Sequence, residues 1–313
     1  MSKAATALGT AQEFSSTERV ITTFETVAAE AESVKAHHKI EVRARITKRT
    51  IGNSGAILYN AMKVANYHEI APSPRLARQV ECFWSLRPSQ PGQAHLVLPD
   101  GCSDLIFWVI DGQLKGSAVG AMTRAIVTSL APKAEIFGVR FHPGMSHGLM
   151  RVPVSILTDA IVDLESLWGK DGRAMEQRLA DATSLQERAA VIDAGLDPQS
   201  DETPVQRAAI WIVANRGDAS ADELARHAGL SARQFRRLCI EQTGVGPKML
   251  CRVIRFRNAA NQIDAGPLNW ADFALDHGYY DQAHFINEFR EFSGVTPAEY
   301  ASVFSNPSPA DRA

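Results

Sequence analysis

The sequence predicts an α+β protein in which a β-rich, barrel-like N-terminal domain precedes an all-α C-terminal domain. Three observations support this fold class. Apolar runs bounded by Asp-Gly pairs fill the region up to residue 141, a helical period begins after Pro153, and the region beyond residue 203 contains an internal repeat. Asp-Gly between apolar runs favours β-hairpins, whereas apolar residues three and four apart favour helices.

The composition is that of an ordinary globular protein. The chain has 313 residues, 45% hydrophobic and 22% charged, with a formal net charge of −2, and this length predicts about two domains. The apolar run from Leu105 to Ile110, like every other apolar run in the chain, is far shorter than the roughly 20 residues of a membrane span, and residues 1–30 show no export signal. The four cysteines lack the Cys-x-x-Cys spacing of a zinc site. We expect a cytoplasmic protein without a membrane segment, metal or cofactor.

Residues 1–65 form an N-terminal extension to which we assign no role. Residues 22–38 have the composition of a surface helix. Residues 40–47 alternate apolar and polar side chains, as a half-buried strand does.

The next region, from about residue 67, has the pattern of strands. Strands are expected over 95–98, 104–110 and 135–141. Asp100-Gly101 and Asp111-Gly112 follow the first two of these and predict hairpin turns, because both residue types tolerate positive φ.

After Pro153 the period becomes helical. One apolar helical stripe is expected from Ile156, Leu157, Ile161, Leu164 and Leu167, and further helices over 174–181 and 184–194. The stretch from Gly195 to Glu202 is polar and rich in helix breakers, so we place a linker at 197–202.

The region beyond the linker contains a repeat with a spacing of fifty residues. Ser231, Phe235, Cys239, Gly244, Val245 and Pro247 recur as Asp281, Phe285, Phe289, Gly294, Val295 and Pro297. Two copies of one supersecondary unit are the simplest explanation.

The first copy has the caps of two short helices. Ser220 with Glu223 and Ser231 with Gln234 are capping boxes, and Gly229 between them suits the left-handed end of the first helix. Two short helices joined by a tight glycine-containing turn describe a helix-turn-helix, and a continuous helix from Lys248 to about Ile263 then links the two copies.

The second helix of the first unit exposes Arg233, Arg236 and Arg237 close to its start at Ser231. A recognition helix inserts its N-terminal residues into the major groove of DNA, where arginine can donate two hydrogen bonds to guanine. The alternative is a solvated basic face. The charge pattern favours DNA, because residues 226–257 carry eight basic side chains against one acidic side chain.

The second unit is less basic. Its predicted recognition helix exposes Gln282, Ala283 and Asn287, and the amide side chains suit adenine. His284 is a candidate phosphate contact or a structural histidine. Acidic residues surround this unit, so we expect the first unit to supply most of the salt-dependent affinity.

Three arginines lie on the helix between the units. Arg252, Arg255 and Arg257 are either phosphate contacts or ion-pair partners within the protein, and the sequence does not choose between these roles. Arg255 is the phosphate contact that we select.

The C-terminal region resembles the AraC/XylS family of bacterial transcription regulators. The resemblance lies in Gly278-Tyr279-Tyr280-Asp281-Gln282-Ala283-His284-Phe285, followed by Phe289-Arg290, Gly294-Val295-Thr296-Pro297 and Tyr300. It covers about residues 203–303 and implies a double helix-turn-helix domain that reads consecutive major-groove segments with the side chains named above. Ala283 and the acidic surroundings depart from the family pattern.

Residues 69–196 look like an uncharacterised N-terminal domain found in some of these regulators. The similarity lies in Cys82-Phe83-Trp84, Leu98-Pro99-Asp100-Gly101 and Gly138-Val139-Arg140-Phe141. It implies a β-rich sensory or dimerising module without identifying a ligand.

Candidate chemistry in the N-terminal region is limited. Trp84, Phe107, Trp108, Phe137 and Phe141 could line an apolar effector pocket or fill the core. His142 and His147 lack the spacing of a metal site, and Cys102 has no histidine nearby in sequence to activate it. We therefore predict no catalytic residues.

Together these features predict a transcription regulator that binds double-stranded DNA. Its expected parts are residues 1–65, a β-rich regulatory or dimerisation domain (66–196), the linker (197–202), the double helix-turn-helix domain (203–303) and a tail (304–313). RNA polymerase, a small-molecule effector and a second copy of the chain are further candidate partners. The alternatives are an N-terminal domain that serves only dimerisation or partner docking, or one with thiol-based sensing or enzymatic activity.

Overall fold

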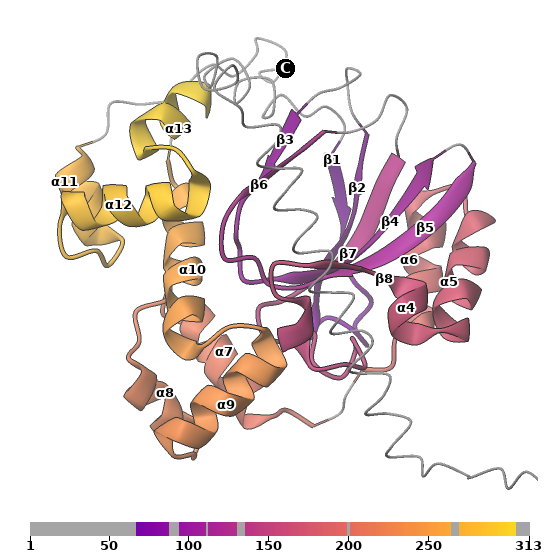
Figure 1. Ribbon diagram of the computed structural model, residues 1–313, viewed down its shortest axis with the longest axis horizontal. Coiled ribbons are helices and arrows are strands. Elements are labelled where there is room, and N and C mark those ends of the chain that lie inside the picture. Colours follow the sequence, from indigo (N-terminus) through magenta and orange to yellow (C-terminus); the bar gives the residue numbers. More distant parts are fainter. Residues whose placement is uncertain are drawn as a thin grey trace, which may run out of the picture.

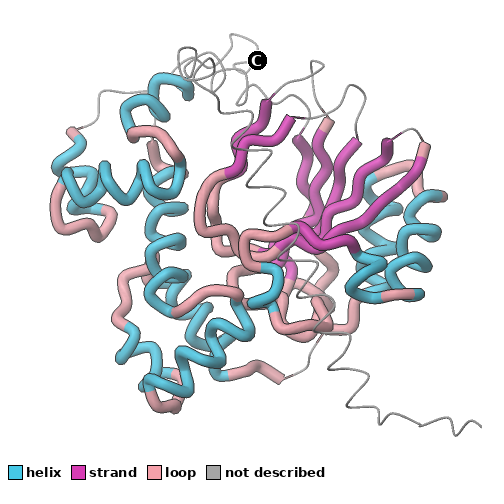
Figure 2. Tube along the Cα trace, in the orientation of Figure 1, coloured by secondary structure: helices cyan, strands magenta, loops and turns pink. Residues whose placement is uncertain are grey.

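A computed structural model describes residues 67–87, 94–110, 112–129, 135–198, 201–263 and 269–304. The strand and helix expected within residues 1–65 lie outside these residues. Strands gather in the N-terminal half and helices in the C-terminal half, with three further helices against the sheet (Figures 1 and 2). The predicted α+β class, with a β-rich N-terminal region and an all-helical C-terminal region, is confirmed.

The main sheet has six antiparallel strands in the order β1-β2-β7-β4-β5-β8. Its strands are β1 (Tyr67–Ile70), β2 (Val80–Leu86), β4 (Ser103–Ile110), β5 (Gln113–Val119), β7 (Glu135–Phe141) and β8 (Ile161–Asp163). The hairpin predicted at Asp111-Gly112 is confirmed, because Ile110 pairs with Gln113. Among the described strands the sheet is open, with β1 and β8 at its edges, whereas the sequence suggested a barrel-like form.

The hairpin predicted at Asp100-Gly101 is wrong. Strand β3 (Ala94–Val97) pairs with β6 (Ile126–Ser129) in a separate two-stranded sheet and not with β4. Gly101 does have a positive φ of 79°, and the Asp100 carboxylate accepts a hydrogen bond from the Cys102 N–H. The turn chemistry is therefore present, but it redirects the chain between two sheets.

The single helical stripe predicted after Pro153 is also wrong. The segment forms a 3-10 turn η1 (Val154–Leu157), the edge strand β8 and the short helix α4 (Leu164–Trp168). Asp159 interrupts it with a positive φ of 53°. Leu157, Leu164 and Leu167 still enter the core, so their apolar spacing reflects burial, which short strands and helices share.

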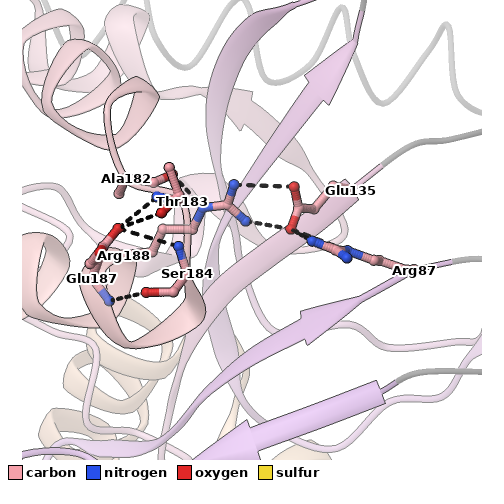
Figure 3. Close-up of polar contacts among 7 residues, drawn as sticks. All are labelled: Arg87, Glu135, Ala182, Thr183, Ser184, Glu187 and Arg188. Atoms are coloured by element: carbon pink, nitrogen blue, oxygen red, sulfur yellow. Dashed lines mark hydrogen bonds and ion pairs between the residues drawn. The ribbon is translucent and has the colours of Figure 1, made fainter.

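Two helices cover one face of the sheet at the positions that the sequence predicted: α5 (Lys170–Ala180) and α6 (Leu185–Gly195). Arg188 of α6 ties this layer to β7 (Figure 3). Its guanidinium forms an ion pair with Glu135 at 2.7 Å and lies 4.2 Å from the centre of the Phe137 ring. Arg188 and Arg87 together hold the pKa of the Glu135 carboxyl below its usual value.

The C-terminal region contains α7 (Pro204–Ala214), α8 (Ala221–His227), α9 (Ala232–Thr243), α10 (Pro247–Ala260), α11 (Trp270–Asp276), α12 (Gln282–Ser293) and α13 (Pro297–Phe304). The continuous helix predicted between the two copies is α10. It runs as a column with α7 to α9 at one end and α11 to α13 at the other (Figure 1).

Helix α10 contributes to two separate cores. Leu250 and Ile254 belong to the core around Phe235, whereas Val253 and Phe256 belong to the core around Phe285. The two copies thus pack against different faces of one helix. No helix among the described residues has both the length and the apolar character needed to cross a bilayer.

Candidate DNA interface

The first helix-turn-helix consists of α8 and α9, and its caps form as the sequence predicts. Ser220 caps α8 in a capping box with Glu223, and Ser231 caps α9 in a second capping box with Gln234. Gly229, in the turn, has a φ of 69°. Phe235 and Cys239 are buried on the inner face of α9, so the opposite face of the helix is turned toward solvent.

The exposed face of α9 carries the three predicted arginines. Arg233, Arg236 and Arg237 lie near the N-terminal end of the helix and are all exposed. Arg237 lies 3.6 Å from Glu241, and their side chains are 70% and 41% exposed. A pair of this kind is weak in water, so it leaves the Arg237 guanidinium available to a ligand.

The second helix-turn-helix consists of α11 and α12. The Asn269 side chain caps α11, and the Asp281 carboxylate caps α12 by accepting from the His284 N–H at 2.7 Å. Gly278, in the turn, has a φ of 75°. Gln282, Ala283 and Asn287 are exposed, as predicted, whereas Phe285 and Phe289 are buried.

His284 has intramolecular partners. Its Nδ1 atom accepts a hydrogen bond from the Tyr280 N–H at 3.3 Å, and its Nε2 atom lies 3.8 Å from the Glu288 carboxylate. Its ring packs edge-on against Tyr279. These contacts favour the structural role over a phosphate contact.

The arginines of α10 contact other parts of the protein. Arg252 forms ion pairs with Glu288 at 2.6 Å and Glu291 at 2.5 Å, both on α12. Arg257 forms an ion pair with Glu81 of β2 at 2.6 Å. These two arginines therefore act as intramolecular ion-pair partners, which was one of the two roles that the sequence left open.

Arg255 connects the two helix-turn-helix units. Its Nη2 atom donates to the Gly217 carbonyl at 3.2 Å, ahead of α8. Its guanidinium carbon also lies 5.6 Å from the centre of the Tyr279 ring, in the turn before α12. The side chain is only partly exposed, so its contacts favour an intramolecular role over the predicted phosphate contact.

The five aromatic residues proposed for an effector pocket do not converge on one space. Phe107, Phe137 and Phe141 are completely buried in the main core, where the rings of Phe107 and Phe137 stack at 5.4 Å. Trp84 belongs to a different cluster, with Cys82 and Leu86. Trp108 follows Phe107 in β4 and therefore points to the opposite face. These positions favour the core role.

Cys102 is buried, and His142 and His147 are half-buried. Burial raises the pKa of the Cys102 thiol well above its usual value, which disfavours the reactive thiolate. Burial also lowers the pKa of His147. Among the described residues, no three His, Cys, Asp or Glu side chains gather as metal ligands.

Three residues had no role assigned to them from the sequence. Tyr280 is 86% exposed in the turn before α12. It lies within the motif from Gly278 to Phe285, but no role was assigned to it. Glu81 and Thr158 contact the C-terminal region through Arg257 and Gly244. Neither has a local sequence signal, since each contact joins residues far apart in the chain.

Comparison with known families gives two matches. Residues 224–302 match the family described as "Helix-turn-helix domain", and residues 68–163 match a "Domain of unknown function (DUF6597)". Among curated proteins, the chain is 36% identical over 74 residues to the HTH-type transcriptional regulator GlxA of Rhizobium meliloti, which is 24% of this chain and 23% of that protein. It is 32% identical over 75 residues to the invasion protein InvF of Salmonella typhi, which is 24% of this chain and 35% of that protein. The chain thus matches about a quarter to a third of the length of these relatives.

Solved structures give more distant likenesses. The C-terminal domain of AraT, a response regulator from Geobacillus stearothermophilus, is 22% identical with a TM-score of 0.33, over 37% of this chain and 97% of that one. ToxT from Vibrio cholerae is 9% identical with a TM-score of 0.41, over 77% of this chain and 100% of that one. The family matches and the two capped units agree on the same C-terminal residues. The chain therefore carries a helix-turn-helix domain over residues 224–302, preceded by a match to the domain family DUF6597 over residues 68–163.

Proposed function

We propose that this protein is a sequence-specific DNA-binding transcription regulator. The observation that carries the proposal is the outer face of α9, where three exposed arginines follow a capped helix start. Recognition helices present this part of the helix to base edges, and arginine recognises guanine through its O6 and N7 atoms. The match to a helix-turn-helix family over these residues supports the same conclusion.

The second unit would read DNA with Gln282 and Asn287. Both side chains are exposed in the first two turns of α12, and in the fifty-residue repeat Gln282 corresponds to Ala232 and Asn287 to Arg237. Because α10 joins the units, one chain would contact two neighbouring major-groove segments, about 34 Å apart. The DNA site would therefore consist of two different half-sites.

The N-terminal region would modulate this activity. Its contacts reach α9, α10 and α12, so a change in this region can reach both DNA-reading units. We propose no catalytic role, and double-stranded DNA is the partner that the exposed arginines fit. RNA polymerase, an effector and a second copy of the chain stay as candidate partners.

Genome-wide DNA capture with the full-length chain tests the proposal. The wild type should enrich a bipartite motif, and the Arg233→Ala/Arg236→Ala/Arg237→Ala variant should lose it, because the first unit would no longer contact base edges. A matched control is Lys170→Ala/Arg173→Ala/Arg178→Ala, which removes three exposed positive charges from α5. Equal enrichment by the wild type and the α9 variant would refute the role of α9, and the absence of any motif would refute the proposed function.

A further inference from the structure

The N-terminal region contacts equivalent ends of both recognition helices. The Thr158 hydroxyl donates to the carbonyl of Gly244 at 2.6 Å, and Gly244 is the C-terminal cap of α9. The Ala125 N–H donates to the carbonyl of Phe292 at 2.6 Å, in the last turn of α12. The helix starts, which carry the proposed DNA contacts, lie at the other ends and are exposed.

A third contact fixes the helix between the units. The Arg257 guanidinium of α10 forms an ion pair with Glu81 of β2 at 2.6 Å, and each side chain is about one quarter exposed. Although burial opposes it, Arg257 holds the pKa of the Glu81 carboxyl below its usual value. Gly101 packs against the same helix, where a Cβ would lie 3.1 Å from Ile254.

Apolar packing surrounds these polar contacts. Ala121 and Met145 of the N-terminal region belong to the core of the first unit, and Leu98 packs against the core of the second. Gly144 approaches α7 so closely that a Cβ would lie 2.7 Å from Ala209. The N-terminal region therefore packs against both units, which lie at the two ends of α10 (Figure 1).

This arrangement forms a closed frame. Helix α10 joins the two units directly, and the N-terminal region joins them a second time through Gly244 and Phe292. If α10 were the single connection between the two units, its bending would move them relative to each other. A second connection through the N-terminal region resists that motion. We propose that the contacts of Thr158, Glu81 and Ala125, which we call the brace, set the spacing at which the two recognition helices read DNA.

The brace favours binding and does not block it, because Arg233, Arg236 and Gln282 are exposed while it is formed. Two linked modules gain affinity only when both can engage at once, and the gain is largest when their geometry is fixed in advance. Glu81 and Thr158 are therefore positioning residues that never touch DNA. This inference rests on the proposed function.

Charge exchange at Glu81 and Arg257 tests the brace in the full-length chain. The variants are Glu81→Arg, Arg257→Glu and the two combined, with Thr158→Val as an independent variant that removes the bond to Gly244. The control exchanges an exposed pair outside the brace, Arg151→Glu/Asp171→Arg. Thermal unfolding of each variant checks that the fold is kept.

Two duplexes derived from the captured motif separate the effects. One has both half-sites, and the other has only the first. Each single exchange and Thr158→Val should weaken binding to the two-site duplex about tenfold. Affinity for the one-site duplex should stay within about twofold of the wild type, because one unit binds it without needing the other at a fixed distance. The combined exchange should restore two-site binding.

A change of spacing gives a readout that lost stability would not produce. When one base pair is inserted between the half-sites, the wild type should lose more affinity than the Glu81→Arg variant, because the loosened chain can follow the new spacing. Variants that match the wild type on every duplex would refute the brace while leaving the proposed function intact. Tighter two-site binding by the variants would show that the contact opposes DNA binding. If the wild type enriches no DNA at all, the proposed function fails first and the brace with it.

Discussion

Basic side chains of the C-terminal region divide into two sets by what they touch. Those on α9 extend into solvent, and the one ion pair among them, between Arg237 and Glu241, is exposed. The three arginines on α10 are engaged: Arg252 with α12, Arg257 with β2, and Arg255 with the loop before α8. A phosphate group would have to displace the partners of the second set, whereas it would meet the first set freely.

Arg255→Ala should therefore change stability more than the salt dependence of DNA binding. The loss of the bond to Gly217 and of the contact with Tyr279 should lower the free energy of unfolding by about 1–2 kcal/mol. Denaturant unfolding measures the first effect, and binding at several salt concentrations measures the second, with exposed Lys248→Ala as the control. A salt slope reduced by about one unit would instead establish the phosphate contact.

At the scale of elements, the helix caps decide where the two units begin. The four caps Ser220, Ser231, Asn269 and Asp281 all accept hydrogen bonds from backbone N–H groups of the helices they start. They involve residues no more than three positions apart, so the sequence alone determines them. This is the reason that the helix-turn-helix units could be predicted closely.

Ser220→Ala should destabilise the first unit by about 1 kcal/mol, because the first turn of α8 loses a side-chain acceptor. Ser220→Thr keeps that acceptor and is the control. Thermal unfolding of the full chain at neutral pH measures the difference, and equal melting temperatures for the alanine and threonine variants would refute the role of the cap.

The same cap should make stability depend on pH. The backbone N–H and hydroxyl of Ser220 donate to the Glu223 carboxylate and lower its pKa in the folded state below the usual 4.5. The resulting stabilisation is present above pH 4.5 and is lost as the pH falls through the folded-state pKa. The difference between the wild type and Ser220→Ala should therefore shrink in acid.

Contacts between distant residues mark the limit of what the sequence predicted. The turn at Asp100-Gly101 was recognised, but the pairing of β3 with β6 depends on a strand about thirty residues further along the chain. For Arg257 the sequence left two roles open, ion-pair partner or phosphate contact. Its partner Glu81 is 176 positions away, so no local pattern could identify it. The aromatic residues were candidates for either an effector pocket or the core, and only the sheet shows that Trp84 and Phe107 lie in different clusters.

At the scale of the whole molecule, charge is distributed unequally between the two units. The first exposes three arginines on its recognition helix. The second exposes amides on α12, and its acidic residues Glu288 and Glu291 both form ion pairs with Arg252. The overall charge of −2 conceals this asymmetry. The two units should therefore contribute to DNA binding in physically different ways.

The Gln282→Ala/Asn287→Ala variant should separate these contributions. Affinity for the two-site duplex should fall, because adenine loses its hydrogen-bond partners, while the slope of log affinity against log salt should be unchanged, because no cation is removed. Fluorescence anisotropy over a salt series gives both quantities, and the α9 triple alanine is the contrasting variant with a shallower slope. A shallower slope for the amide variant would assign phosphate contacts to the second unit.

Helix α10 also has a consequence for unfolding. Leu250 and Ile254 complete one core and Val253 and Phe256 complete the other, so neither unit has a full interior without this helix. Local opening of either unit would expose one face of α10 to solvent. The other unit, which packs on the opposite face, would then be destabilised as well. The two units should therefore open together in hydrogen exchange as one cooperative block, although each resembles a complete small domain in outline.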